Sequence, residues 1–327
     1  MCLLTKDLLY KFFYNNNYVV VHPDNINNNK DTLFVTAGIQ PLIKKYKSGE
    51  LSSNKKFFIA QPVIRTQFCN SLSEGTSLAF INATSSSFNN SEKEYYSMID
   101  DWYEIFYNLG MKQSDFSTRS DSYDRIWGDL TVRGKRTFHY YENLEIGDTT
   151  FFTYIANKNG EPLADTMCDL GFGIERIRWK INKKSYYDLH SDSSRLPYQV
   201  KAYLSAIALL AVNDIKPSNK SVGYRARLFS KKLVLLLNGR MLNNIEENYL
   251  NECIRYWNDW QCVQTFNNRQ SIIDEYVRNS NRYIIDILTN CGYNNISGID
   301  INISRGEFAK RLVNSGVNNA IVKKLTR

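Results

Sequence analysis

The sequence predicts an α+β protein in which an antiparallel sheet flanked by helices is followed by an all-helical domain. Two observations predict this fold class. Up to about residue 190, short runs rich in β-branched and aromatic residues alternate with loops. From about residue 196, apolar residues recur with the spacing of helices. We therefore predict one domain over residues 1–190 and a helical domain over 196–327, with the boundary inside the charged, serine- and proline-containing stretch 183–197.

Individual elements follow from the same patterns. Strand composition is found in four runs, which read YVVVH, KKFFIAQPVI, TFHYY and TTFFTYIA. Between them, aromatic and aliphatic residues recur at helical spacing from Glu92 to Leu109, which predicts a helix whose aromatic side chains belong to the core. In the second half, QVKAYLSAIALLAVND and RARLFSKKLVLLLNG predict two helices, and two or three more follow.

Composition narrows the classes of function. With 43% hydrophobic and 13% aromatic residues, the 327-residue chain predicts a packed core rather than disorder. Its six cysteines form no C-x-x-C pair and it has only three histidines, so we expect no zinc site, no disulfide framework and a reducing, cytoplasmic setting. The longest apolar run, Ala202–Val212, is too short to span a bilayer. The net charge of +8 suits a polyanionic partner and an ordinary protein equally well.

The most informative segment reads DLGFGIER and ends in Arg176. Gly171 and Gly173 lack the Cβ atoms that hold a backbone away from a ligand, and we interpret the segment as a turn. A small-residue turn beside a helix start offers free N–H groups and a guanidinium to a phosphate. The IRWKI run that follows fits either a helix or a buried strand. A second arginine, Arg65, lies upstream in QPVIRTQF, which reads as a strand carrying a charge.

Together these segments resemble the second and third signature motifs of class II aminoacyl-tRNA synthetases, specifically the alanyl-tRNA synthetase family. Two further segments fall in the family's order: TLFVTAGIQPLIK from Thr32, and KPSNKSVGY from Lys216, which resembles the M-P-S-N-x-x-x-G-Y of the tRNA-recognition region. The family's third motif ends D-T-G-M-G-L-E-R, and the chain matches it at Asp169, Gly171, Gly173, Glu175 and Arg176.

The resemblance implies ATP-dependent activation of an amino acid, with Mg²⁺, and its transfer to a tRNA acceptor stem in protein biosynthesis. Arg65 and Arg176 would be the catalytic residues. Arg65 would hold the α-phosphate and the amino-acid carboxylate, and Arg176 the γ-phosphate. Phe80 would stack on adenine, and Gly173 would also lie at the ATP.

The resemblance also places the amino acid and the RNA. Asp169 would pair with the α-amino group while Gly171 leaves room beside it, and we expect Trp127 and Asp148 to line the same pocket. Asn219 matches the asparagine with which the family helps to read a G·U pair in the acceptor stem. The family's second reading residue, an aspartate, corresponds to Asn314.

A basic stripe follows Asn219. Arg227 and Lys231 are four residues apart, which places them on one side of a helix, and Arg225 lies nearby. Such a stripe suits a phosphate backbone, and a solvated helix face explains it equally well.

The loop between Arg65 and Phe80 is shorter than in the family, with the usual G-G-K-H-N-D reduced to QFCN, and the chain departs from the family pattern at three further places. The family's E-M-L-G-N-F-S-F reads INATSSSF here, which puts Ile81 where a glutamate stands in the family. Its G-D-T-G-P-C-G-P-C-T-E reads GDLTVRGKRTF, with Phe138 in place of the glutamate and three added cations. Its E-I-W-N reads EIGD, ending at Asp148. If both changed positions of that strand face the pocket, bulk is lost and a negative charge is gained, which predicts a larger or cationic amino acid rather than alanine.

Three functions remain open on the sequence. The first is an alanyl-type synthetase without editing, because the family's editing and oligomerisation domains have no counterpart in these 327 residues, and we expect a monomer. The second is a biosynthetic paralogue that activates a different amino acid for a tRNA- or carrier-dependent pathway. The third is a non-catalytic RNA-binding or regulatory paralogue. Retention of Arg65 and Arg176 favours the first two.

Overall fold

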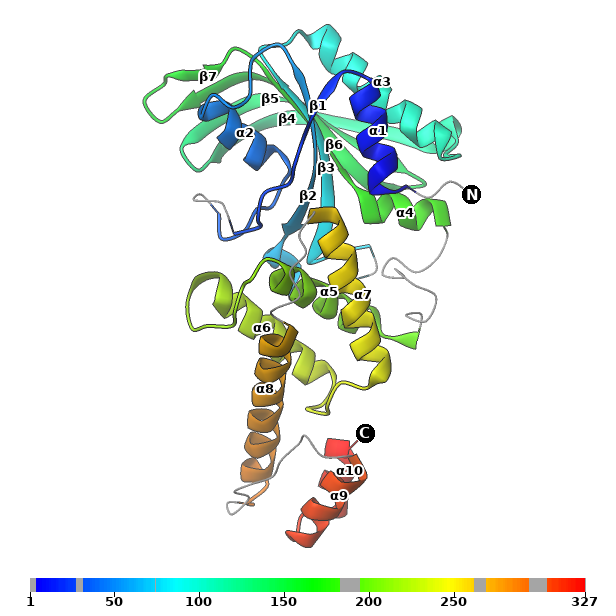
Figure 1. Cartoon of the computed structure of the whole chain (residues 1–327), viewed down its shortest axis with the longest axis vertical. Coiled ribbons are helices and arrows are strands. Elements are labelled where there is room, and N and C mark those ends of the chain that lie inside the picture. The colour runs from blue at the N-terminus through cyan, green and yellow to red at the C-terminus, as the bar shows by residue number, and fades with distance from the viewer. Residues whose placement is uncertain are drawn as a thin grey trace. The chain divides into compact units, whose positions relative to one another are not determined.

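The computed structural model describes residues 4–27, 32–73, 75–182, 195–261, 269–293 and 305–326. The chain folds into two compact units (Figure 1). Most of the expected boundary stretch, residues 183–194, lies outside the described residues. The first unit comprises Met1–Asn70, Glu74–Tyr186 and Trp260–Cys262, and the second comprises Ser71–Ser73, Tyr187–Asp259 and Val263–Arg327.

One eight-stranded sheet forms the centre of the first unit, in the order β1-β2-β3-β8-β6-β5-β4 with β7 paired to β6. The β1–β2 pair is parallel and the other pairs of the described sheet are antiparallel, which confirms the predicted fold class. The strands are β1 (Tyr18–Val21), β2 (Lys56–Ile64), β3 (Ala79–Phe88), β4 (Phe116–Trp127), β5 (Leu130–Tyr141), β6 (Leu144–Asn157), β7 (Pro162–Ala164) and β8 (Met167–Gly173).

Two helices cover one face of this sheet (Figure 1). Phe13 stacks on Phe58 of β2 with ring centroids 4.0 Å apart, and Trp102 packs against Phe172 of β8 at 4.5 Å. The helix predicted from Glu92 to Leu109 and the role of its aromatic residues in the core are therefore confirmed. These helices are α1 (Lys6–Asn15) and α3 (Glu92–Asn108).

The other face carries α2 (Ile39–Lys47), whose apolar residues share a core cluster with residues of β2 and β3. The Asn82 side-chain oxygen accepts a hydrogen bond from the backbone N–H of Gly38 at 2.7 Å, which fixes the start of α2 over β3. A Cβ atom on Gly38 would lie 2.3 Å from the Thr84 hydroxyl, so only glycine allows this approach.

The DLGFG segment forms strand β8 rather than the predicted turn, and α4 (Ile174–Asn182) begins at the next residue. β8 is paired on both sides, with β3 and with β6, so its backbone groups are satisfied as a central strand. This long-range pairing overrides the local turn signal of Gly171 and Gly173. The IRWKI run, left open by the sequence, is helical.

The second unit is helical throughout its described residues, as predicted. At its centre α5 is buried along almost its whole length, and the Trp257 indole N–H of α7 donates to the Ser205 carbonyl of α5 at 2.9 Å. No helix in the described ranges is both long and apolar enough to cross a membrane. The helices are α5 (Tyr198–Val212), α6 (Ser221–Leu236), α7 (Asn244–Gln261), α8 (Arg269–Asn290), α9 (Arg305–Asn314) and α10 (Asn319–Thr326).

Candidate functional site

Arg65 and Phe80 meet at the ends of two neighbouring strands. Arg65 directly follows β2, its backbone N–H donates to the Leu78 carbonyl at 2.8 Å, and Phe80 is the second residue of β3. The Arg65 guanidinium carbon lies 4.9 Å from the centroid of the Phe80 ring, and its Nε donates to the Thr36 carbonyl at 3.1 Å. The structure therefore brings together two of the residues predicted to bind ATP.

Arg176 reaches the site from the first turn of α4. Its Nε donates to the Gly75 carbonyl at 3.2 Å and its Nη1 to the Glu145 carbonyl at 2.9 Å, and the Glu145 carboxylate lies 3.6 Å away. These contacts tie the guanidinium to two other segments and limit its freedom before any ligand binds.

Glu175, which the sequence assigned no role, fixes the start of α4. Both carboxylate oxygens of this buried residue accept from the backbone N–H of Ile81, at 3.1 and 2.9 Å. Ile81 pairs with Pro62 on one side and lies beyond the last β3–β8 pair on the other, so its N–H has no strand partner. The Ile81 side chain is buried, and the Glu175 carboxylate accepts the hydrogen bond that its backbone N–H would otherwise lack.

Asp148 and Asp169 lie on one face of the sheet in adjacent rows. Asp148 of β6 pairs with Gly171 of β8, which pairs with Thr84 of β3. Asp169 is two residues before Gly171, and residues two apart on a strand project to the same face. Phe80 and Thr84 share that face by the same spacing on β3. A Cβ atom on Gly171 would lie 3.1 Å from the Asn82 amide nitrogen. The glycine therefore leaves space above the strand between Asp148 and Thr84.

Both carboxylates are held in an environment that disfavours their ionised form. Burial raises the pKa of Asp148 to about 6, an effect that Arg65 opposes and Glu145 reinforces. Burial and the neighbouring Asp148 raise the pKa of Asp169 well above its ordinary value, and Arg65 opposes this. Burial lowers the pKa of the Arg65 guanidinium, against the attraction of Asp148. The mutual influence shows that these groups form one electrostatic cluster.

Arg136 borders this cluster from β5. Its Nε and Nη2 donate to the Asp121 carboxylate at 3.1 and 2.8 Å, and its guanidinium lies 4.2 Å from the Phe138 ring. Phe138 pairs with Asp148, and Arg119 covers its ring at 4.9 Å. At the position where the family pattern has a glutamate, the chain therefore has an aromatic ring close to two arginine guanidinium groups.

Gly147 does not face the pocket. It pairs with Phe172 of β8, on the face opposite Asp148. A Cβ atom there would lie 2.4 Å from the Gly171 carbonyl oxygen and from the Phe172 ring. The glycine allows two strands and a core ring to approach closely, so the expectation that Gly147 enlarges the pocket is wrong and only Asp148 faces it.

Trp127 lies away from these residues. It ends β4, its indole N–H donates to the Tyr123 hydroxyl at 3.1 Å, and its ring packs on Phe152 at 5.2 Å. The β4 residue in the row of Asp148 is Arg119, eight positions earlier, which corresponds to about 25 Å along a strand. The structure does not bring Trp127 to Asp148 and Asp169.

The arrangement offers positioning and charge rather than a nucleophile. Arg65 and Arg176 can donate hydrogen bonds to anionic oxygens, and Asp148 and Asp169 can bind cationic groups. Gly173 ends β8 beside α4, and a Cβ atom there would make only ordinary contacts of 3.8 Å with Arg176 and Ile146. Within the described ranges, no three His, Cys, Asp or Glu side chains converge as metal ligands.

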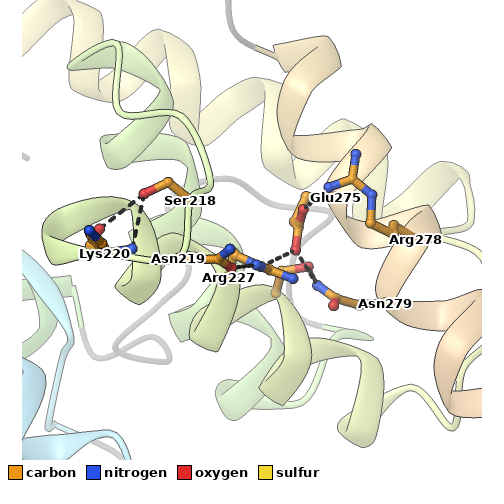
Figure 2. Close-up of polar contacts among 8 residues, drawn as sticks. Ser218, Asn219, Lys220, Arg227, Glu275, Arg278 and Asn279 are labelled. Atoms are coloured by element: carbon orange, nitrogen blue, oxygen red, sulfur yellow. Dashed lines mark hydrogen bonds and ion pairs between the residues drawn. The ribbon is translucent and has the colours of Figure 1, made fainter.

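In the second unit, Arg227 is engaged by an acidic partner (Figure 2). Its Nε donates to Glu275 of α8 at 3.0 Å, and its Nη1 donates to the Asn219 side-chain oxygen. Glu275 is only 2% exposed and also receives Arg278 at 2.9 Å and Asn279 at 3.1 Å. Arg227 therefore joins α6 to α8 and orients Asn219, and it is not a freely exposed cation of a basic stripe.

The loop before α6 is folded back onto the helix. The Ser218 hydroxyl donates to the Lys220 carbonyl at 3.0 Å, and the Ser218 N–H donates to the Gly223 carbonyl at 3.1 Å. A Cβ atom on Gly223 would lie 2.3 Å from the Ser218 hydroxyl oxygen, which explains the glycine in the KPSNKSVGY segment. The fold of this loop places Asn219 beside Arg227 (Figure 2).

Lys231 and Arg225 remain available for an anion. Lys231 is exposed and Arg225 half-buried, and neither makes a hydrogen bond or ion pair with another residue of the described chain. Asn314 ends α9, and in the described residues no hydrogen bond joins it to Asn219.

Comparison with known proteins gives similarity of structure only. No family model and no curated protein sequence matches the chain. A pyrrolysyl-tRNA synthetase from Desulfitobacterium hafniense is similar over 55% of this chain and 68% of its own, at 13% identity and a TM-score of 0.40. A prolyl-tRNA synthetase from Cryptosporidium parvum, solved with L-proline and AMP, is similar over 83% of this chain and 77% of its own, at 9% identity and a TM-score of 0.33.

Asp148→Asn should stabilise the ligand-free protein in a pH-dependent way. A carboxyl whose pKa is raised on folding destabilises the folded state as it ionises, so the penalty develops between about pH 4 and 6 and is complete above that range. At pH 7.5 we expect the variant to gain on the order of 1–3 kcal/mol in the free energy of unfolding, and at pH 4 to gain nothing. Denaturant unfolding at both pH values measures this. Asp124→Asn, on the exposed hairpin, serves as the control, and an equal gain at both pH values would contradict the assignment.

Arg227→Ala should destabilise the helical unit, whereas Lys231→Ala should not. Removing one partner of a buried ion pair costs about 3–5 kcal/mol. Because Arg278 still pairs with Glu275, we expect a loss of about 2–3 kcal/mol for Arg227→Ala. The exposed Lys231 should change stability by less than about 0.5 kcal/mol. Circular dichroism during urea unfolding measures both, and equal effects would show that Arg227 is as free as Lys231.

Proposed function

We propose that the protein activates an amino acid with ATP, forming an aminoacyl-adenylate, and transfers the aminoacyl group to a tRNA acceptor without editing. One observation carries the proposal. Arg65 and Arg176, which the motif resemblance assigns to the phosphates of ATP, lie with Phe80, Asp148 and Asp169 in one cluster on one sheet. Segments far apart in the sequence build this cluster, as a shared ligand requires.

The proposed chemistry needs no nucleophile from the protein. The amino-acid carboxylate attacks the α-phosphorus of ATP, and the bond to the β-phosphate oxygen breaks to release pyrophosphate. Arg65 withdraws negative charge from the α-phosphate and the carboxylate, and Arg176 binds the γ-phosphate. Asp169 holds the α-ammonium group, and Phe80 stacks on adenine. Catalysis of this kind rests on positioning and electrostatics. Arg176 suits this role because its hydrogen bonds to the Gly75 and Glu145 carbonyls hold the guanidinium in place before a ligand binds.

Mg²⁺ would enter with ATP. In proteins this ion binds through one or two carboxylates together with substrate phosphates, so a dedicated cluster of protein ligands is not required. Its role stays a prediction, as does the absence of zinc, and no step above is routed through either ion.

The acceptor is proposed to bind the helical unit. Lys231 and Arg225 supply charge for a phosphate backbone, and Asn219 supplies the polar group that can reach a base edge in the shallow groove of an A-form stem. Because Arg227 donates to the Asn219 oxygen, the Asn219 amide nitrogen is the group directed to RNA.

A biosynthetic paralogue is the second candidate, with either tRNA or a carrier as acceptor. The observation that favours it is Asp148, a charged residue facing the pocket where the alanyl family has a neutral asparagine. A non-catalytic RNA-binding role is the third candidate, and the joint retention of Arg65 and Arg176 in one cluster argues against it.

Arg65→Ala and Arg176→Ala should each lower the rate of amino-acid-dependent pyrophosphate exchange at least about tenfold. Hydrogen bonds to charged groups contribute about 1.5–3 kcal/mol each, and every 1.4 kcal/mol changes a rate by about tenfold. Arg133→Ala, which removes an exposed cation paired with Asp124, is the control and should leave the rate unchanged. Wild-type rates in both site variants would overturn the catalytic proposal.

Binding of acceptor-stem minihelices should depend on Lys231 and on salt. Lys231→Ala should weaken binding of all minihelices by a similar factor, because phosphate contacts carry no sequence information. Asn219→Ala should instead reduce discrimination between a G·U and a G·C stem. Gel-shift titrations at two salt concentrations measure both effects. If no minihelix binds at low salt, the RNA acceptor is wrong and a carrier is favoured.

A further inference from the structure

We propose that the amino acid taken by this site carries a second cationic group on its side chain, and that Asp148 is the residue that binds it. The inference rests on the proposed function and names its substrate class. It is carried by the placement of Asp148 and by the partners of the surrounding charged groups.

The EIGD strand changes the charge of the pocket and adds no room to it. Gly147 faces the opposite side of the sheet and is required by the close approach of the Gly171 carbonyl and the Phe172 ring. It therefore adds no room for a bulkier side chain. Asp148, one residue on, pairs with Gly171 on the site face. Of these two neighbouring residues, only Asp148 can contact a substrate, and it brings a carboxylate.

The cations of the site do not neutralise this carboxylate. Arg136 directs two nitrogens to Asp121, and Arg176 pairs with Glu145. Arg136 still acts on Asp148 at a distance, and Arg65 acts on both Asp148 and Asp169, but in the described structure Arg65 makes no hydrogen bond to either. Among the described residues, neither Asp148 nor Asp169 therefore has an ion-pair partner in the ligand-free site.

A bound zwitterion leaves this imbalance in place. Its α-ammonium group pairs with Asp169, and its carboxylate pairs with the Arg65 guanidinium. Asp148 is then without a cation in a half-buried site, which is unfavourable for an ionised carboxylate. An ammonium or guanidinium on the side chain removes the deficit, because hydrogen bonds between charged partners are the strong ones in such a setting.

The spacing of the two carboxylates fits one substrate. Asp148 lies opposite Gly171, and Asp169 is two residues from Gly171 on the neighbouring strand. Diagonal neighbours of this kind have Cα atoms about 7–8 Å apart. An α-amino and a side-chain amino group joined by three to five carbon atoms can bind both residues at once.

Cation binding should follow the ionisation of Asp148. The charged groups that act on it are Arg65, Glu145, Arg136 and Asp121. Asp169 lies in the adjacent row, and Tyr123 of β4 is a further titratable group near both aspartates. Because burial raises the pKa of Asp148 to about 6, its carboxylate is largely protonated at pH 5 and ionised at pH 7.5. The preference for a cationic over a neutral amino acid should rise across this interval.

The test compares matched amino acids on the full-length protein. Lysine is matched with norleucine and ornithine with norvaline, and arginine and 2,4-diaminobutyrate complete the cationic set. Binding is measured by calorimetry without ATP, and activation by pyrophosphate exchange, at pH 5 and 7.5. At pH 7.5 we expect at least one cationic amino acid to exceed its neutral match about tenfold or more in affinity and in specificity constant.

Asp148→Asn should collapse that ratio toward one and remove its pH dependence, whereas Asp124→Asn should leave the ratio unchanged. If a neutral amino acid exchanges pyrophosphate best in the wild type, the inference is overturned and the proposed function stands. If Asp148→Asn lowers exchange equally for all amino acids and raises the Mg²⁺ requirement, the carboxylate binds the metal and the inference is overturned. If no amino acid supports exchange, the proposed function fails together with it.

Discussion

The pairing of β8 between β3 and β6 is the constraint on which the candidate site depends. It aligns Asp148, Gly171 and Thr84 in one row and places Asp169 in the next. The same strand delivers the chain into α4, so the position of Arg176 follows from the register of β8. The Glu175 carboxylate completes the junction by binding the Ile81 N–H that strand pairing leaves without a partner. A change in the register of β8 by one residue would turn Asp169 and Gly171 to the opposite face, away from Asp148.

The site keeps like charges together at the expense of stability. Burial raises the pKa values of Asp148 and Asp169, and Glu145 adds to the first effect and Asp148 to the second, so the ligand-free fold bears an unfavourable electrostatic contribution. Core packing beside the site supplies compensating stability. Phe57, Ile59, Phe88 and Phe152 are almost fully buried in one cluster on the same face, beside α2. The site therefore combines a well-packed apolar cluster with buried charges that destabilise the fold. Such a combination is expected where function requires charges that stability alone would not select.

The helical unit shows a different use of charge. Arg227 and Lys231 occupy neighbouring turns of α6, yet one pairs with buried Glu275 and the other is exposed. The difference comes from α8, whose Glu275 pairs with Arg227 (Figure 2). The pairing also orients the Asn219 amide and thus links the packing of α6 on α8 to the loop proposed to contact RNA. Of two basic residues on the same helix, Arg227 therefore has a structural role in packing against α8, whereas Lys231 stays exposed.

Local patterns in the sequence determined the elements whose partners lie nearby or whose burial follows a strict period. The helix near Glu92, the four apolar strands and the helical second half all follow from such patterns. Strand β4 was not predicted, because an exposed edge strand rich in polar residues has no apolar alternation to reveal it. The motif order also identified Arg65, Phe80, Asp169 and Arg176 as neighbours, since matched signatures carry spatial information that composition lacks.

Only the tertiary structure decided which face each residue occupies and which charges are already paired. Gly147 and Asp148 are adjacent in the chain, but strand alternation sends one to the Phe172 ring and the other to the site. Gly171 and Gly173 suggested a turn, and pairing with two long-range strands made the segment extended. Trp127 shares a hairpin with Phe138, but the strand carries it away from Asp148. Arg227 looked like a free cation until α8 supplied Glu275. In each case the deciding partner is remote in the sequence, so its contribution to the free energy appears only when the chain is folded.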